Sequence, residues 1–126
     1  MAKNIVEPGF VRTDERGRFV EILNEGHWEN LICGRMNAGA VLGHHYHRKT
    51  RIFFFLQTGS ARIGVIHVET CQTKALLLKA NQGIVLETNE SHAIRFIENS
   101  EFLMLKSRRY DPEDPDTIPY PVPDSL

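Results

Sequence analysis

The sequence has little of what several classes of protein depend on. Its 126 residues include only two cysteines, Cys33 and Cys71, at a spacing that fits neither a zinc finger nor a redox motif. Both lie among apolar or β-forming residues, so we expect buried, reduced thiols. An excess of one charge is also missing, with 15 Lys and Arg against 16 Asp and Glu. This balance argues against nucleic acids and anionic membranes as partners.

Long hydrophobic runs are missing as well. No stretch approaches the roughly 18 to 20 apolar residues that cross a bilayer, and residues 1–8 lack the basic and then apolar order of a signal peptide. We therefore expect a cytoplasmic protein. With 41% hydrophobic residues the chain can bury a core of its own. The sequence predicts one domain over 1–126, with a core over about 10–108 and an extended tail over 109–126.

Helical periodicity is scarce, and short runs rich in β-branched and aromatic residues recur instead. Turn segments rich in glycine and asparagine separate these runs. The predicted strands are Phe19–Leu23, Leu31–Met36, Arg51–Gln57, Ala61–Glu69, Thr73–Lys79, Ile84–Glu87, His92–Ile97 and Glu101–Lys106. This pattern favours an all-β fold, either a closed barrel or a double sheet.

The final segment has a different composition. Residues 110–126 carry five of the six prolines. Proline cannot donate a hydrogen bond to a sheet, so we expect this segment to be an extended strap over the surface or to be disordered.

The sequence has one dense cluster of side chains that can bind a metal. Residues 43–47 read Gly-His-His-Tyr-His. Side chains alternate along an extended chain, so His45 and His47 share one face. A third imidazole from a distant strand can complete a site with three ligands and an open position. His92, at the start of a predicted strand, is the best candidate.

The same residues resemble the motifs of a known family. Residues 43–47, followed by Gly59, resemble the compact form of the first cupin motif. Residues 81–92 resemble the second motif, with Asn89 in the place of a turn glycine and His92 as its histidine.

Two further segments narrow this resemblance. Residues 14–21, Asp-Glu-Arg-Gly-Arg-Phe-Val-Glu, are similar to the opening of sugar-nucleotide epimerase-like cupins. Residues 110–117 resemble the ending of the C-terminal cupin domain of capsular polysaccharide proteins that epimerise a UDP-4-keto sugar. The chain therefore resembles the RmlC-like cupins, and most of all that capsule-type domain.

The resemblance implies a jelly-roll barrel with its site in the mouth, often as a dimer. It implies proton abstraction and return beside the carbonyl of a 4-keto-6-deoxy sugar nucleotide, by an epimerase or ketoisomerase of capsule or O-antigen type polysaccharide biosynthesis. In the rhamnose-type members the histidine matching His45 is a catalytic base without metal, and in the capsule-type members the histidines matching His45, His47 and His92 form a zinc site with a glutamate. For this chain we expect His45 as the leading base and His45, His47 and His92 as the ligands of a divalent metal, either zinc or one of iron, nickel and manganese. A bound cation would stabilise the enolate. The expected partners are a small-molecule sugar nucleotide and a second copy of the chain.

Two positions depart from the family pattern. The motif glutamate falls at Ile52, or at Arg51 in the shorter spacing, so a metal would rest on three histidines alone. The arginine expected before Gly43 is Leu42, which removes a phosphate contact of the rhamnose-type pattern. Two other classes of function therefore stay open. One is a three-histidine iron(II) dioxygenase, and the other is a cupin that binds a small ligand without catalysis.

Arg35 and Arg95 are candidate substrate-binding residues. Each lies on a predicted strand among apolar residues, so an inward guanidinium would suit an anionic or carbonyl-bearing ligand, and an outward orientation is the alternative. The predicted strand at residues 52–56, Ile-Phe-Phe-Phe-Leu, is apolar on both sides. We expect a second sheet or a partner subunit to cover its outer side, which favours a homodimer.

Overall fold

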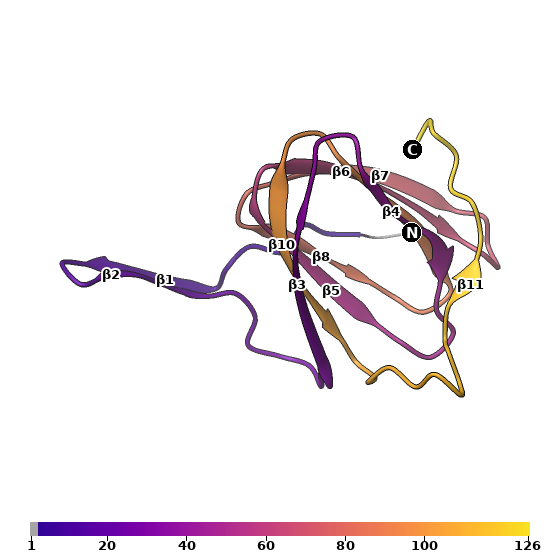
Figure 1. Cartoon of the computed structure of the whole chain (residues 1–126), viewed down its shortest axis with the longest axis horizontal. Coiled ribbons are helices and arrows are strands. Elements are labelled where there is room, and N and C mark those ends of the chain that lie inside the picture. The colour runs from indigo at the N-terminus through magenta and orange to yellow at the C-terminus, as the bar shows by residue number, and fades with distance from the viewer. Residues whose placement is uncertain (1–2) are drawn as a thin grey trace.

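Two antiparallel sheets enclose the hydrophobic core of the protein (Figure 1). The computed structural model describes residues 3–126 and contains strands but no helix within them. The first sheet has the order β3 (Asn30–Met36), β10 (Ser100–Lys106), β5 (Ile52–Thr58) and β8 (Gln82–Leu86). The second has the order β11 (Ile118–Pro119), β4 (Val41–Tyr46), β9 (Glu90–Phe96), β6 (Ser60–His67) and β7 (Thr73–Lys79). The prediction of an all-β fold is confirmed.

The observed strands include three that the sequence pattern did not predict. Each predicted strand overlaps an observed one, but β1 (Phe10–Asp14), β4 and β11 were missed. In β4 the reason is local, because Gly43 and His44 have φ angles of 113° and 58° and interrupt the extended backbone. Hydrophobic periodicity cannot reveal a strand that is broken in this way.

The core lies between the inward faces of the two sheets. Three phenylalanine rings form its centre, with Phe54 contacting Phe102 and Phe96 at centroid distances of 5.3 and 6.3 Å. All of residues 52–56 are buried, as expected for a strand that is apolar on both sides. Phe53 and Phe55, on the outward side, are each 2% exposed within the single chain. Their burial does not require a partner subunit, so it no longer supports a homodimer.

A two-stranded hairpin projects from the barrel (Figure 1). It consists of β1 and β2 (Gly17–Glu21), paired only with each other. The predicted turn is fixed by Asp14, whose carboxylate accepts a hydrogen bond from the backbone N–H of Arg16 at 2.9 Å. Phe10 and Phe19 contact each other edge to face, yet about half of each side chain is exposed.

Both ends of the chain lie against the barrel. On the N-terminal side, Val6 forms a β-bridge with Gly83, and Lys3 forms a buried ion pair with Glu90. At the other end, residues 118–126 follow the five-stranded sheet. There the guanidinium of Arg95 donates to the carbonyl oxygen of Leu126 at 2.8 Å, and Val122 is buried.

Two expectations from the sequence, on the cysteines and on membrane-spanning segments, can be compared with this fold. Cys33 and Cys71 are unpaired, as expected, but both are exposed, so the prediction of buried thiols is wrong. Apolar neighbours in the sequence do not indicate burial here, because both side chains lie on the solvent side of the fold. Within residues 3–126 there is no helix long and apolar enough to cross a membrane.

Candidate active site

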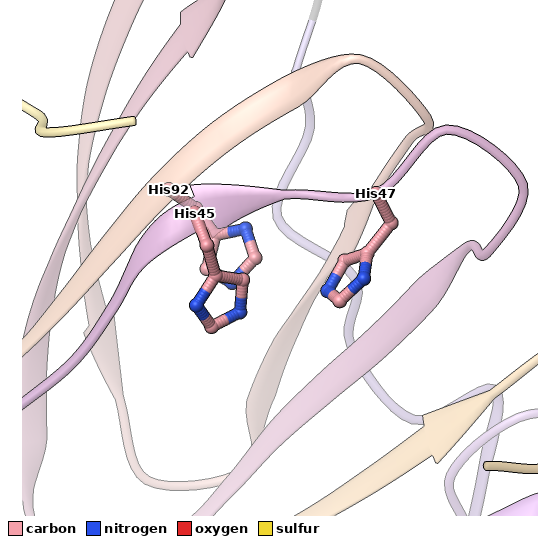
Figure 2. A group of neighbouring side chains, drawn as sticks. All are labelled: His45, His47 and His92. Carbon is pink, nitrogen blue, oxygen red and sulfur yellow. The ribbon is translucent and has the colours of Figure 1, made fainter. Parts of the chain in front are cut away.

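Three imidazoles converge inside the barrel mouth (Figure 2). The ring centroid of His45 lies 5.1 Å from that of His47 and 4.8 Å from that of His92. One ligand nitrogen from each of the three residues lies within 4.8 Å of the other two. The structure therefore brings together all three of the residues that were predicted as metal ligands.

The pairing of β4 with β9 creates this meeting point. His45 is the direct cross-strand partner of His92. The register shifts between Gly43 and His45, which leaves His44 as an extra, unpaired residue with φ near 58°. At Gly43, a Cβ would collide with the carbonyl oxygen of His92, so only glycine lets the two strands approach this closely.

Beyond this bulge, the side chains alternate as the sequence predicted. His45 and His47 point inward together. His44 points the other way, where its Nδ1 accepts a hydrogen bond from the backbone N–H of Val122 at 3.0 Å. Tyr46 also lies outside the cluster and packs against the ring of Tyr120. The C-terminal segment therefore packs on the outer side of β4, and the clustered histidines lie on its inner side.

Backbone carbonyl groups determine which ring nitrogens are basic. The Nδ1 of His45 lies 3.1 Å from the carbonyl oxygen of Gly43, and the Nδ1 of His47 is bonded to the carbonyl oxygen of Asp116. A carbonyl oxygen can only accept, so each Nδ1 carries the hydrogen and each Nε2 keeps a free lone pair. In both His45 and His47, Nε2 is therefore the basic nitrogen.

The cluster contains two buried nitrogens without a hydrogen-bond partner among residues 3–126. They are Nε2 of His47 and Nδ1 of His92. An unpartnered buried polar atom costs about 1–3 kcal/mol, so it is a feature that needs an explanation. A buried nitrogen that lacks a protein partner is available to a ligand.

Burial keeps the three imidazoles neutral at physiological pH. Burial, with smaller contributions from the nearby rings of His45 and His47, lowers the pKa of His92 to about 3. The pKa values of His45 and His47 are also lowered, again mainly by burial. Neutral imidazoles are the form that can accept a proton or ligate a metal.

Asp116 connects the C-terminal segment to the site. Its carboxylate accepts hydrogen bonds from the backbone N–H groups of Arg48 and Lys49 and from the hydroxyl of Thr50, at 2.8–2.9 Å. Burial alone would raise the pKa of this carboxyl, but these donors outweigh it and the pKa is lowered. Its main-chain oxygen holds His47. One residue therefore fixes both the loop after β4 and the proton on the imidazole.

The donor set fits a divalent metal ion. It offers three neutral nitrogens, two of them buried and unpartnered, which is a donor type suited to zinc and to iron(II). Two ligands that are each about 2 Å from one ion lie at most about 4 Å apart. Nitrogens spread over as much as 4.8 Å would therefore have to draw together by small side-chain rotations. Ile52, at the motif glutamate position, is 1% exposed and offers no ligand.

The structure does not bring the two candidate arginines to the histidines. Arg35 is exposed on β3, on the outer side of the four-stranded sheet. Arg95 lies on β9 but faces away from His92, and its guanidinium donates to the carbonyl oxygens of Val122, Pro123 and Leu126. The inward orientation considered for them is therefore wrong, because strand alternation places both outside the barrel.

Sequence reasoning missed two residues that belong to the site. Asp116 lies in the proline-rich tail, where no local signal indicates that it reaches His47. Lys106 lines the same pocket as His47 and Thr50. It could have been found, because it continues the inward face of β10 that begins with Phe102 and Met104. A lysine in phase with core residues is an unusual pattern.

A family model matches most of the chain. The model for the polysaccharide biosynthesis C-terminal domain covers residues 12–118. The chain belongs to this family. The match begins within β1 of the hairpin, includes β2 to β10 with His45, His47 and His92, and extends through Asp116 to the first residue of β11. No curated protein matches the chain.

Solved structures share the fold of this family member at low sequence identity. The chain is 20% identical to the rmlC epimerase of Mycobacterium tuberculosis, covering 88% of this chain and 66% of that one, with a TM-score of 0.74. It is 18% identical to a 3,4-ketoisomerase from Helicobacter canadensis, covering 94% and 90%, with a TM-score of 0.75. The capsular polysaccharide assembling protein CapF of Staphylococcus aureus gives 20% identity and a TM-score of 0.71, covering 90% and 34%.

These likenesses establish the architecture. The chain has the RmlC-like cupin fold that the sequence predicted. It spans about a third of the length of CapF and just under two-thirds of the length of the M. tuberculosis epimerase.

Proposed function

We propose that this domain removes a proton beside the carbonyl of a 4-keto-6-deoxy sugar nucleotide and returns it, as an epimerase or ketoisomerase. The reaction would serve polysaccharide biosynthesis of the capsule or O-antigen type. Two kinds of observation support this proposal. The family is that of a polysaccharide biosynthesis domain, and proteins of the same fold are named as sugar epimerases and a ketoisomerase.

The state of His45 is the observation that carries the proposal. Its Nδ1 is engaged by the carbonyl oxygen of Gly43, so Nε2 is the basic nitrogen. Burial holds the pKa of this residue below its usual value, so the ring is neutral and can accept a proton at pH 7. Unlike His47 and His92, His45 is only half-buried, so a substrate can reach it. A neutral, oriented and accessible imidazole is what proton abstraction next to a ketone requires.

A divalent metal is part of the same proposal. His45, His47 and His92 would hold it, and when bound it would act as a Lewis acid that polarises the substrate carbonyl. The orphaned nitrogens of His47 and His92 support this assignment. If His45 serves as a ligand, its Nε2 is no longer free to take a proton. The metal-bound and metal-free forms therefore assign different tasks to the same ring.

We also propose that the domain is a cytoplasmic homodimer. The projecting β1–β2 hairpin exposes Phe10, Val11 and Phe19 by 46–53%, and a second copy would cover these side chains. The exposed, unpaired thiols of Cys33 and Cys71 suit a reducing compartment.

Solvent exchange tests the proposed reaction. The domain is incubated in D2O with a 4-keto-6-deoxy sugar nucleotide, and deuterium incorporation next to the ketone is followed by NMR. We expect wild-type protein to catalyse exchange and His45→Ala to lose it, with a nearly unchanged thermal midpoint. The matched control is His27→Ala, because His27 is exposed in a loop. Wild-type protein that exchanges no deuterium would contradict the proposal.

Two measurements separate the other classes of function. Stoichiometric iron(II) with oxygen uptake in place of deuterium exchange would indicate a dioxygenase. Binding of a small ligand without either activity would indicate a non-catalytic cupin.

A further inference from the structure

Lys106 is a cationic residue at the C-terminal end of β10. Phe102 and Met104 on the same strand pack in the core, and side-chain alternation puts Lys106 on the same inward face. Its direct partner on β5 is Ile52, one of the fully buried residues. The side chain lines the pocket that also includes His47 and Thr50. Lys106 therefore shares a pocket with His47, one of the three clustered histidines.

The charge of Lys106 is not neutralised by the protein. Within residues 3–126, its ammonium makes no ion pair or hydrogen bond, although the residue is only partly exposed. Lys3, the other substantially buried lysine, shows the usual solution, since it is paired with Glu90. Burial lowers the pKa of Lys106, and the charge of Lys106 in turn contributes to the lowered pKa of each of the three histidines. The cation therefore acts electrostatically on the whole cluster.

We propose that Lys106 is a catalytic residue whose ammonium binds the ketone oxygen of the substrate and stabilises the negative charge that forms there. This inference rests on the proposed function. In the metal-free form, Nε2 of His45 takes the proton from the carbon beside the ketone, and the electrons of the broken C–H bond form a C=C bond. The C=O electron pair moves onto oxygen. Return of the proton reverses these changes, so no oxidant or reductant is needed.

Two other cations near the mouth are paired with carboxylates, and Arg109, which lines the same pocket as Lys106, is exposed to solvent. Arg51 forms an ion pair with Glu87 at 2.9 Å, outside the barrel. Arg108 lies beyond the end of β10 and is 3.6 Å from the carboxylate of Asp114. The imidazoles are neutral and supply no full charge at pH 7. A positive group that faces a developing oxyanion in a site with little water is the kind of interaction that contributes most to catalysis.

The experiment compares three lysine variants with wild-type protein in the exchange assay. Lys106→Met removes the charge with little change in shape, and Lys106→Arg keeps the charge. Lys74→Met is the matched control, because Lys74 is exposed on β7. We expect Lys106→Met to lower kcat for exchange by about 10²–10³-fold, with KM changed by less than about threefold. Lys106→Arg should retain clearly more activity than Lys106→Met, and Lys74→Met should match wild type.

A second measurement does not depend on activity. Binding of Co²⁺ alone is followed by its visible absorption, and Lys106→Met should bind it more tightly than wild type, because a like charge has been removed. Equal Co²⁺ affinity would show that the ammonium does not act on the histidines, and would overturn the inference. So would Lys106→Met that exchanges deuterium within about threefold of wild type. Wild-type protein without exchange would instead overturn the proposed function and this inference with it.

Discussion

The two ends of the barrel interior are built from the same strands, but one end is packed with apolar side chains and the other contains polar side chains without partners. At one end, β9 and β10 supply Phe96 and Phe102, whose rings lie 6.1 Å apart and contact Phe54. At the other end the same two strands supply His92 and Lys106. The phenylalanine rings pack against one another. The histidine and the lysine have polar atoms without a protein partner in the described chain.

This contrast shows how the fold divides its tasks. Buried polar groups without partners lower the stability of a protein, whereas well-packed aromatic groups raise it. The apolar end therefore stabilises a barrel whose polar end is left open to a ligand. Variants at the two ends should fail in different ways, and the following predictions test this difference from the largest expected effect to the smallest.

The largest effect on stability should come from the apolar end. Phe54→Ala removes a fully buried ring that contacts Phe96 and Phe102, and should lower the free energy of unfolding by about 3–5 kcal/mol. Urea denaturation measures this loss. Phe10→Ala on the projecting hairpin is the control, and should change stability by less than about 0.5 kcal/mol in dilute protein. Similar losses for the two variants would mean that the phenylalanine cluster is not the centre of the core.

Acid should destabilise the protein through the polar end. The folded-state pKa of His92 is about 3, whereas the unfolded chain binds this proton near pH 6.5. Above pH 6.5 neither state is protonated there. Below it only the unfolded state binds the proton, so His92 alone lowers stability by about 1.4 kcal/mol per pH unit until pH approaches 3.

Urea midpoints between pH 7 and pH 4, measured with a metal chelator present, test this dependence. His92→Gln should flatten the decline. His27→Gln, at an exposed position, should leave it unchanged. A wild-type midpoint that does not fall over this range would contradict the buried, neutral state of His92.

Loss of the Asp116 carboxylate should affect both stability and the site. Asp116→Ala leaves the N–H groups of Arg48 and Lys49 and the hydroxyl of Thr50 without their acceptor, which should cost about 1–3 kcal/mol. Because the carboxylate contacts position the main-chain carbonyl that orients His47, Co²⁺ affinity should fall by about 10- to 100-fold. Asp124→Ala, with a fully exposed side chain, is the control for both measurements. Weaker stability with unchanged Co²⁺ affinity would limit Asp116 to a structural role.

The smallest expected effect concerns the outer side of β9. Arg95→Met removes the donor that holds three carbonyl groups of residues 122–126, and should lower stability by about 1 kcal/mol. Hydrogen exchange should accelerate at the N–H groups of Tyr120 and Val122, with little change in the core strands. Arg62→Met, which loses one bond to the carbonyl oxygen of Ser125, should show a weaker effect. A larger effect of Arg62→Met than of Arg95→Met would mean that Arg62 is the residue that mainly holds the C-terminal segment in place.

Local patterns were enough to predict the strands and the histidine site. Alternation correctly put His45 and His47 on one face, and the second motif correctly brought His92 to them. Asn89, in the place of a turn glycine, has a φ angle of 63° and makes the turn that the motif requires. These features depend on short segments or on motif spacing, so the sequence contains them.

Long-range features were not accessible in the same way. The position of Asp116 depends on contacts with a loop nearly seventy residues earlier in the chain. The outward position of Arg95, by contrast, could have been predicted, because alternation from the inward His92 puts residue 95 on the opposite face of β9. Exposure of Cys33 and Cys71 depends on which face of the finished fold each residue occupies. A linear pattern fixes periodicity, but not which face of a strand becomes the interior.

The bond between Asp116 and His47 has a consequence for the order of synthesis. A ribosome makes all of the barrel strands from β3 to β10 before it reaches residue 116. The nascent sheets can therefore close while the imidazole of His47 still lacks its anchor. A stop codon introduced after residue 108 would leave a chain that contains strands β1 to β10 and all three histidines, but neither β11 nor the carbonyl that orients His47.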